Sequence, residues 1–176
     1  SVAASSSQCL PWYALLLSVK WMMKGLNLPD HGVEIRHAAQ GDLVFDPVRR
    51  RWVVLTPEEW VRQHVLNHLV HDLACPLSLI AVEHSLVLNR MVRRADIVVH
   101  GPGARPLLLV ECKAPHVKLG MAVFEQAARY NTVFRVPFLL VTNGVEHSCC
   151  RIGTDGSITF LPSVPDWASM AKALPA

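Results

Sequence analysis

The sequence lacks any long apolar run and carries little net charge. No stretch of its 176 residues reaches the roughly 18 to 20 uninterrupted apolar residues of a transmembrane helix. The apolar segment at residues 10–23 is broken by Lys20 and has no basic leader before it, so it does not resemble a signal peptide. The formal charge of +3 permits nucleic-acid binding but does not by itself predict it.

Paired cysteines are missing as well. The five cysteines show no C-x-x-C spacing, and an odd set of this kind is typical of free thiols in a reducing compartment. We therefore expect a cytoplasmic protein without a membrane partner. His64, His68, His71 and Cys75 fall at helical intervals, but no second half-site with metal-ligand spacing follows them. We interpret these four residues as a His-rich helix face rather than a zinc site.

An internal repeat and a linker are also absent, as is the phosphate-binding motif G-x-x-x-x-G-K-[ST]. These residues therefore cannot drive ATP-dependent translocation. Half of the residues are apolar (51%) and 18% are charged, which is a composition that folds rather than stays disordered. We expect an N-terminal tail over residues 1–21, unlike the rest of the chain, and a single domain over residues 22–176.

The order of apolar runs and turn residues predicts an α/β (α+β-like) fold. Three short strands at residues 33–37, 43–46 and 51–55 indicate an N-terminal β-meander. Thr56 as N-cap with Pro57 at the first helical position marks a helix start. The later segments are expected as strands at 79–89, 95–100, 107–114 and 138–144, a basic turn at 90–94, a helix at 118–134, a hairpin at 148–161 and a short helix at 165–174. This order predicts a mixed central β-sheet flanked by helices, with a parallel crossover through the 118–134 helix.

The most informative stretch is residues 96–113, two predicted strands joined by a Gly/Pro turn. The second strand is apolar on both faces, as in a strand covered on both sides, and then ends in a Glu-Cys-Lys sequence. Because side chains alternate along a strand, Glu111 and Lys113 share a face. Antiparallel pairing places Asp96 opposite Val110 or Glu111. We therefore expect the carboxylates of Asp96 and Glu111 to lie close enough to share an ion.

Two carboxylates at the end of a central strand suit Mg²⁺ or Mn²⁺, because such ions bind hard oxygen ligands, keep several waters and accept phosphate oxygens. The metal lowers the pKa of a bound water and offsets negative charge in phosphoryl transfer. Lys113 could orient or deprotonate that water, and the backbone carbonyl of Cys112 could be a further ligand. The alternative is structural, since a lone aspartate is often a cap and Glu-x-Lys is often an edge ion pair.

Asp96, Glu111 and Lys113, followed by a helical Gln-x-x-x-Tyr pattern, resemble the PD-(D/E)XK nuclease superfamily. More closely, the segments TPEEWVRQ, RADIVV, LLLVECKAP, FEQAARYN and FLLVTNG resemble stand-alone proteins that share the N-terminal nuclease domain of type I restriction enzyme R subunits. The similarity covers residues 26–167 and implies a restriction-endonuclease-like core. The chain departs from the superfamily's name at Ala95, where a proline is expected.

The resemblance implies a role for each matching residue. Asp96 and Glu111 would be metal ligands, joined by the Cys112 carbonyl and by Glu59 from the first helix. The implied catalytic set is Asp96, Glu111, Lys113, Glu59, Gln126 and Tyr130, of which Gln126 and Tyr130 would orient the site or the DNA strand. Two alternatives stay open: Glu59 can be a helix-capping carboxylate, and the Gln126–Tyr130 pair can be ordinary helix-packing residues.

The expected function is that of a Mg²⁺-dependent deoxyribonuclease in restriction, defence or DNA processing, with DNA as its partner. Clustered basic residues would hold phosphates, and the expected nucleic-acid-binding residues are Arg62, Arg93, Arg94, Lys118 and Arg129. A non-catalytic nucleic-acid-binding module with a nuclease fold remains an alternative, as does a subunit of a larger restriction complex. A homodimer is also left open.

Overall fold

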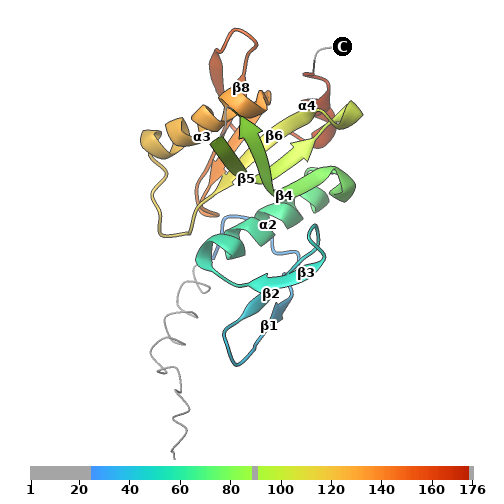
Figure 1. Ribbon diagram of the computed structural model, residues 1–176, viewed down its shortest axis with the longest axis vertical. Coiled ribbons are helices and arrows are strands. Elements are labelled where there is room, and N and C mark those ends of the chain that lie inside the picture. Colours follow the sequence, from blue (N-terminus) through green and yellow to red (C-terminus); the bar gives the residue numbers. More distant parts are fainter. Residues whose placement is uncertain (1–24, 89–90, 175–176) are drawn as a thin grey trace, which may run out of the picture.

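The computed structural model describes residues 25–88 and 91–174, which form two β-sheets with helices packed between and around them (Figure 1). The smaller sheet has three strands in the order β1-β2-β3, and the larger has six in the order β4-β5-β6-β7-β8-β9. This mixed α/β arrangement confirms the predicted class. The predicted tail, residues 1–21, lies outside the described residues.

The three-stranded sheet is the predicted antiparallel meander. Its strands are β1 (Ile35–Arg36), β2 (Leu43–Asp46) and β3 (Arg51–Val54). Asp46 ends β2 and is completely buried. It accepts a hydrogen bond of 2.6 Å from the backbone amide of Arg49 in the following turn. A buried carboxylate needs partners of this kind, and further ones come from the helix that follows.

Helix α2 (Pro57–His71) begins where the sequence predicted. Thr56 is the N-cap, and its side chain accepts a hydrogen bond of 3.0 Å from the backbone amide of Glu59. Val61, Val65 and Leu69 are buried in the main hydrophobic core. The helix lies between the meander and the larger sheet (Figure 1), so its side chains can reach both.

Strands β4 (Ile80–Leu88) and β5 (Met91–His100) form a long antiparallel hairpin. The predicted basic turn at residues 90–94 is wrong in the part that is described, because β5 already begins at Met91 and Arg94 pairs with Ser85 in the ladder. A charged side chain needs contact with solvent, and an exposed position on a strand provides it as well as a turn does. Arg94 also finds a carboxylate partner, Glu83, on the neighbouring strand.

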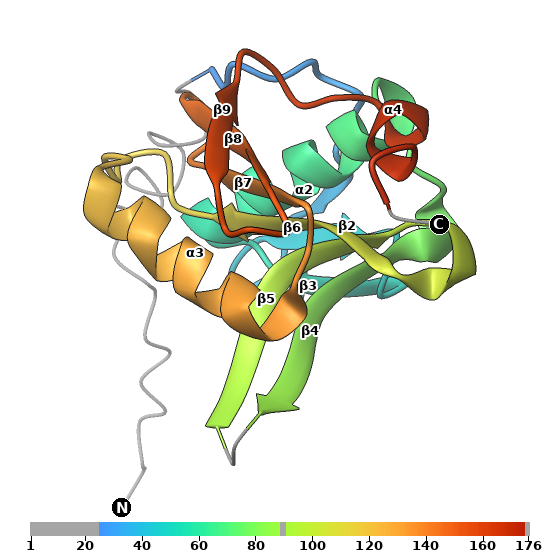
Figure 2. The same cartoon turned by 90° about the horizontal axis from the view of Figure 1, so that it is seen from above.

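Strand β6 (Pro106–Cys112) is the doubly covered central strand that its apolar pattern predicted, since all of its residues after Pro106 are buried. Leu108 belongs to the core on the side of α2, whereas Leu109 belongs to a second core that includes Phe124 of α3 (Met121–Phe134). Helices α2 and α3 therefore cover opposite faces of the sheet (Figure 2).

Strand β7 (Phe138–Thr142) runs parallel to β6, as predicted for a crossover through α3. The predicted C-terminal hairpin is formed by β8 (His147–Ile152) and β9 (Ile158–Leu161), and the short helix by α4 (Trp167–Ala171). Two 3-10 turns, η1 (Leu77–Leu79) and η2 (Pro102–Ala104), complete the described elements. No helix within the described ranges is long and apolar enough to cross a membrane.

Candidate active site

Asp96 and Glu111 meet at the end of the β5–β6 ladder. Ile97 lies opposite Val110, and the next position on each strand is Asp96 or Glu111. The Asp96 Oδ2 atom accepts a hydrogen bond of 2.7 Å from the backbone amide of Cys112. This bond fixes the Asp96 carboxylate against the end of β6, beside Glu111, as the antiparallel register predicted.

Glu111 and Lys113 form an ion pair on one side of the strand end, in which Lys113 Nζ donates to Glu111 Oε1 at 2.7 Å. Glu111 is only 8% exposed, and its burial, together with the charge of Asp96, raises its pKa. Burial lowers the pKa of Lys113, but the hydrogen bond and charge of Glu111 outweigh this effect and the pKa is raised. Lys113 is therefore an ammonium that donates hydrogen bonds, and in this geometry it is not a free base.

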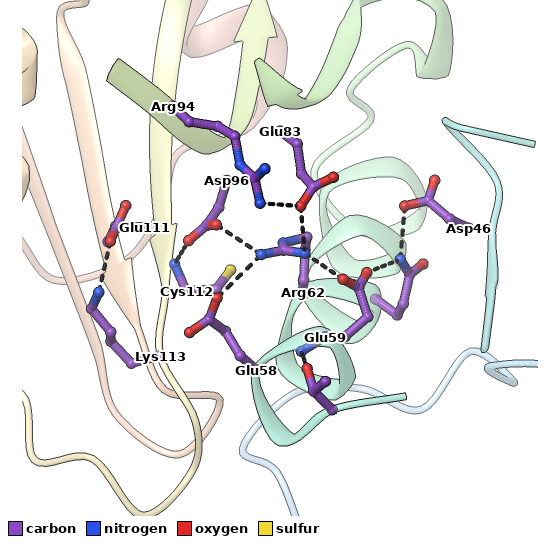
Figure 3. A network of polar contacts seen from close by, with 12 residues as sticks. Asp46, Glu58, Glu59, Arg62, Glu83, Arg94, Asp96, Glu111, Cys112 and Lys113 are labelled. Atoms are coloured by element: carbon purple, nitrogen blue, oxygen red, sulfur yellow. Dashed lines mark hydrogen bonds and ion pairs between the residues drawn. The ribbon is translucent and has the colours of Figure 1, made fainter. Parts of the chain in front are cut away.

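Helix α2 contributes Arg62, which lies among four carboxylates, those of Glu58, Glu59, Glu83 and Asp96 (Figure 3). Arg62 Nη2 donates to Asp96 Oδ1 at 2.8 Å and lies 3.3 Å from Glu58 Oε1, while Nη1 donates to Glu59 Oε2. Burial disfavours the charged guanidinium, but Asp96 and Glu59 outweigh it and raise the pKa of Arg62. Its side chain is 5% exposed, which argues against the predicted contact with DNA phosphates.

The predicted metal ligand Glu59 is not brought to the Asp96–Glu111 pair. Its Oε1 atom accepts hydrogen bonds from Arg49 at 2.7 Å and from Gln63 at 2.8 Å, and its Oε2 atom faces Arg62. Glu59 is thus a buried member of an arginine–carboxylate network. The backbone amide of Glu59 donates a hydrogen bond to the side chain of the N-cap residue Thr56. The Glu59 carboxylate makes the contacts with Arg49, Arg62 and Gln63 instead of capping the helix.

The neighbouring residue Glu58, rather than Glu59, lies on the Asp96 side of Arg62. A single nitrogen, Arg62 Nη2, contacts both Glu58 and Asp96. Burial and the charge of Asp96 raise the pKa of Glu58, and Glu58 in turn raises the pKa of Glu111. The sequence reasoning missed Glu58, although its four-residue spacing from Arg62 was a signal that the two could pair.

A second arginine extends the network to the meander. Arg49 Nε donates to Asp46 at 2.7 Å, Nη1 to Glu83 at 2.8 Å and Nη2 to Glu59 at 2.7 Å. Glu83 adopts φ 51°, which is unusual for a non-glycine residue in a strand, and it also accepts a hydrogen bond from Arg94. An unbroken line of ion pairs therefore runs through Asp46, Arg49, Glu59, Arg62 and Asp96.

The remaining predicted residues lie farther out or lack described side chains. Gln126 is exposed on α3, Lys118 is exposed just before it, and Arg94 is exposed on β5 beside Glu83. The backbones of Arg93, Arg129 and Tyr130 belong to β5 and α3, but their side chains lie outside the described ones. The roles expected for all six residues stay predictions.

The carboxylates of Asp96, Glu111 and Glu58 fit Mg²⁺ in their donor chemistry. They are hard oxygen ligands, and a divalent cation would relieve the repulsion that helps raise the pKa of Glu58 and Glu111. In the part of the chain that the structure describes, no three His, Cys, Asp or Glu side chains are arranged to hold a metal by themselves. Mg²⁺ generally binds one or two carboxylates, while waters and phosphate oxygens complete its coordination shell.

The sequence matches the model of the type I restriction enzyme R protein N-terminus family over residues 57–165. The chain belongs to this family. The matched region runs from the start of α2 to the loop before α4 and contains Asp96, Glu111 and Lys113. Membership in the R protein N-terminus family confirms the resemblance that the sequence motifs indicated.

A solved fragment assigned as an HsdR subunit of a type I restriction enzyme from Vibrio vulnificus YJ016 shares the fold. The two structures superpose with a TM-score of 0.50 at 20% sequence identity, over 67% of this chain and 25% of that chain. At this identity the likeness concerns the fold alone, and the present chain corresponds to about a quarter of the longer one. No curated protein matches the sequence.

Proposed function

We propose that this member of the R protein N-terminus family is a Mg²⁺-dependent deoxyribonuclease that hydrolyses phosphodiester bonds in restriction or DNA processing. The observation that best supports this is the convergence of Asp96 with the Glu111–Lys113 pair at one strand end. Asp96 is bonded to the Cys112 amide, and Lys113 to Glu111, each at 2.7 Å. The family to which the chain belongs supports the link to restriction.

Asp96 and Glu111, with the carbonyl of Cys112, would hold the Mg²⁺ (or Mn²⁺) ion. When bound, this ion supplies a water of lowered pKa and offsets charge on the phosphate. Lys113, as an ammonium, would donate a hydrogen bond to a phosphate oxygen or to the attacking water and so stabilise the developing negative charge. We assign the contribution of α2 to Glu58, which shares Arg62 with Asp96.

DNA would be held by exposed basic residues near these strand ends. Arg94 and Lys118 are exposed and are candidates for phosphate contacts, and Arg93 and Arg129 remain candidates from the sequence. Gln126 and Tyr130 on α3 would orient the DNA strand. Phosphate contacts of this kind make binding depend on salt concentration but carry no base specificity.

A non-catalytic nucleic-acid-binding module, or a subunit of a restriction complex, is the second candidate. One observation favours it: both Asp96 oxygens and one Glu111 oxygen already contact protein donors, so the site is partly neutralised from within. This candidate predicts DNA binding that needs neither metal nor Glu111 and that weakens with salt.

Cleavage of plasmid DNA in Mg²⁺ or Mn²⁺ distinguishes the two. We expect the wild type to cut DNA, EDTA to abolish cutting, and Lys113→Ala to slow it by at least about 100-fold, the usual loss on removing a donor to a developing negative charge. Lys172→Ala is the matched control, because Lys172 is an exposed lysine beyond α4. Intact DNA with the wild type, or an unchanged rate in Lys113→Ala, would overturn the nuclease assignment.

A further inference from the structure

The Arg62 guanidinium ties Asp96 to charges on two other elements of the fold. It donates to Asp96 at 2.8 Å and also to Glu59 (Figure 3). Glu59 in turn accepts a hydrogen bond from Arg49, and Arg49 is anchored on Asp46. Asp46, Glu59 and Arg62 are at most 6% exposed. Water screens buried charges of this kind only weakly, so each ion pair restricts the position of the next.

Asp96 is held by one donor at each carboxylate oxygen. Arg62 contacts Oδ1, and the Cys112 amide contacts Oδ2 at 2.7 Å. A carboxylate held at both oxygens cannot rotate freely, while each oxygen keeps a further acceptor site. The backbone donor cannot move away from Asp96 without disturbing β6, so Arg62 is the partner whose loss would free the carboxylate.

We propose that Arg62 is a positioning residue for the metal site, which keeps the Asp96 carboxylate in the orientation that receives the cation. This inference rests on the proposed function. Groups that orient a metal ligand in this way typically change metal affinity or activity by about 10- to 100-fold when they are removed. Arg62 acts through Asp96 and is not itself expected to contact the substrate.

Two other roles for Arg62 predict different results. If Arg62 only stabilises the fold, its loss lowers stability but leaves the metal affinity of the folded protein unchanged. If Arg62 competes with the metal for Asp96, its loss tightens metal binding, because a positive charge next to the site repels a divalent cation.

Calorimetric titration of the whole chain with Mn²⁺ separates these roles without relying on catalysis. Arg49→Ala is the matched control for Arg62→Ala, because Arg49 is also largely buried, at 13% exposure, and makes three ion pairs, none of them with Asp96. We expect the Kd for Mn²⁺ to rise about tenfold or more in Arg62→Ala, at a temperature where circular dichroism shows both variants to be folded. The Kd should change much less in Arg49→Ala, because Arg49 reaches Asp96 only through Glu59 and Arg62.

Arg62→Lys covers the case in which Arg62→Ala does not fold. It keeps the positive charge but loses the planar fork that reaches Asp96 and Glu59 together, so we expect an intermediate rise in Kd. Added guanidinium ion should restore Mn²⁺ affinity to Arg62→Ala and leave Arg49→Ala unaffected.

An unchanged or lower Kd in both Arg62 variants overturns the positioning role. DNA cleavage by the wild type is measured in parallel so that two failures can be told apart. A wild type that cleaves DNA, with Arg62 variants that bind Mn²⁺ normally, overturns this inference alone. A wild type that binds Mn²⁺ but cuts no DNA overturns only the nuclease assignment, and one that does neither overturns both.

Discussion

Replacing Glu59 by alanine tests whether the buried arginine–carboxylate network stabilises the fold. Glu59 is 6% exposed and accepts hydrogen bonds from Arg49, Arg62 and Gln63. Its removal takes one carboxylate from each of two buried guanidinium ions. The adjacent residue Glu58 offers a matched comparison in the same helical turn, since its side chain is 45% exposed and has one contact of 3.3 Å to Arg62.

The expected loss of folding free energy in Glu59→Ala depends on which carboxylates remain around Arg49 and Arg62. Removing one partner of a buried ion pair costs about 3 to 5 kcal/mol. Arg49 keeps two carboxylates, and Arg62 keeps Asp96, the looser Glu58 and Glu83 at 4.0 Å. We therefore place Glu59→Ala at the lower end, near about 3 kcal/mol. For a chain of this size that corresponds to a fall in Tm of roughly 6 to 12 °C. Glu58→Ala should cost at most about 0.5 kcal/mol, the value of an exposed ion pair.

Urea unfolding followed by circular dichroism measures both variants, with thermal melting as a second probe. The free energy of unfolding should fall by several-fold more in Glu59→Ala than in Glu58→Ala. If the two variants lose equal stability, or if Glu59→Ala loses less than about 1 kcal/mol, the network does not stabilise the fold as the burial of Glu59 implies.

Two further outcomes follow from the charges at the site. Burial and the charge of Asp96 raise the pKa of Glu111 above 4.5 in the folded protein. Protonated Glu111 therefore stabilises the fold fully below pH 4.5, and this stabilisation is lost as the pH rises through the raised pKa. The free energy of unfolding of Glu111→Gln should therefore fall less over this range than that of the wild type, and parallel pH curves from urea titrations would contradict this. Arg94→Ala should weaken binding of all DNA sequences alike and reduce the slope of log affinity against log salt by about 1, measured by fluorescence anisotropy; an unchanged slope would place Arg94 away from the DNA.

Local chemistry explains which parts of the site the sequence could predict. Thr56 and Pro57 specify the start of α2 through backbone capping alone, and the structure confirms that start. The position of Asp96 beside Glu111 follows from the antiparallel register across a short turn, and Ile97 opposite Val110 confirms it. Both inferences depend on residues that are close in sequence.

The partners of the buried charges could not be predicted in this way. Arg62 and Asp96 are 34 residues apart, as are Arg49 and Glu83, and only tertiary packing brings them together. Adjacent helical residues point about 100° apart. Glu58 and Glu59 both reach Arg62, but through different nitrogens, and the packing of α2 decides which of them shares a nitrogen with Asp96.

The basic cluster at residues 90–94 was misinterpreted for a related reason. Charge indicates contact with solvent, and an exposed strand offers such contact as well as a turn does. Arg94 lies on β5 and pairs with Glu83 across the hairpin. A clustered charge therefore predicted exposure correctly for Arg94 but predicted the wrong backbone conformation.

A crystal structure of the whole chain grown with Mn²⁺, with data collected at the manganese absorption edge, would show whether Asp96 and Glu111 bind a metal ion together. We predict one anomalous peak within ligand distance of a carboxylate oxygen of Asp96 and one of Glu111, with Arg62 still bonded to Asp96. A map without a peak between these carboxylates, or with Mn²⁺ bound only elsewhere, would contradict the assignment of this strand end as a metal-dependent nuclease site.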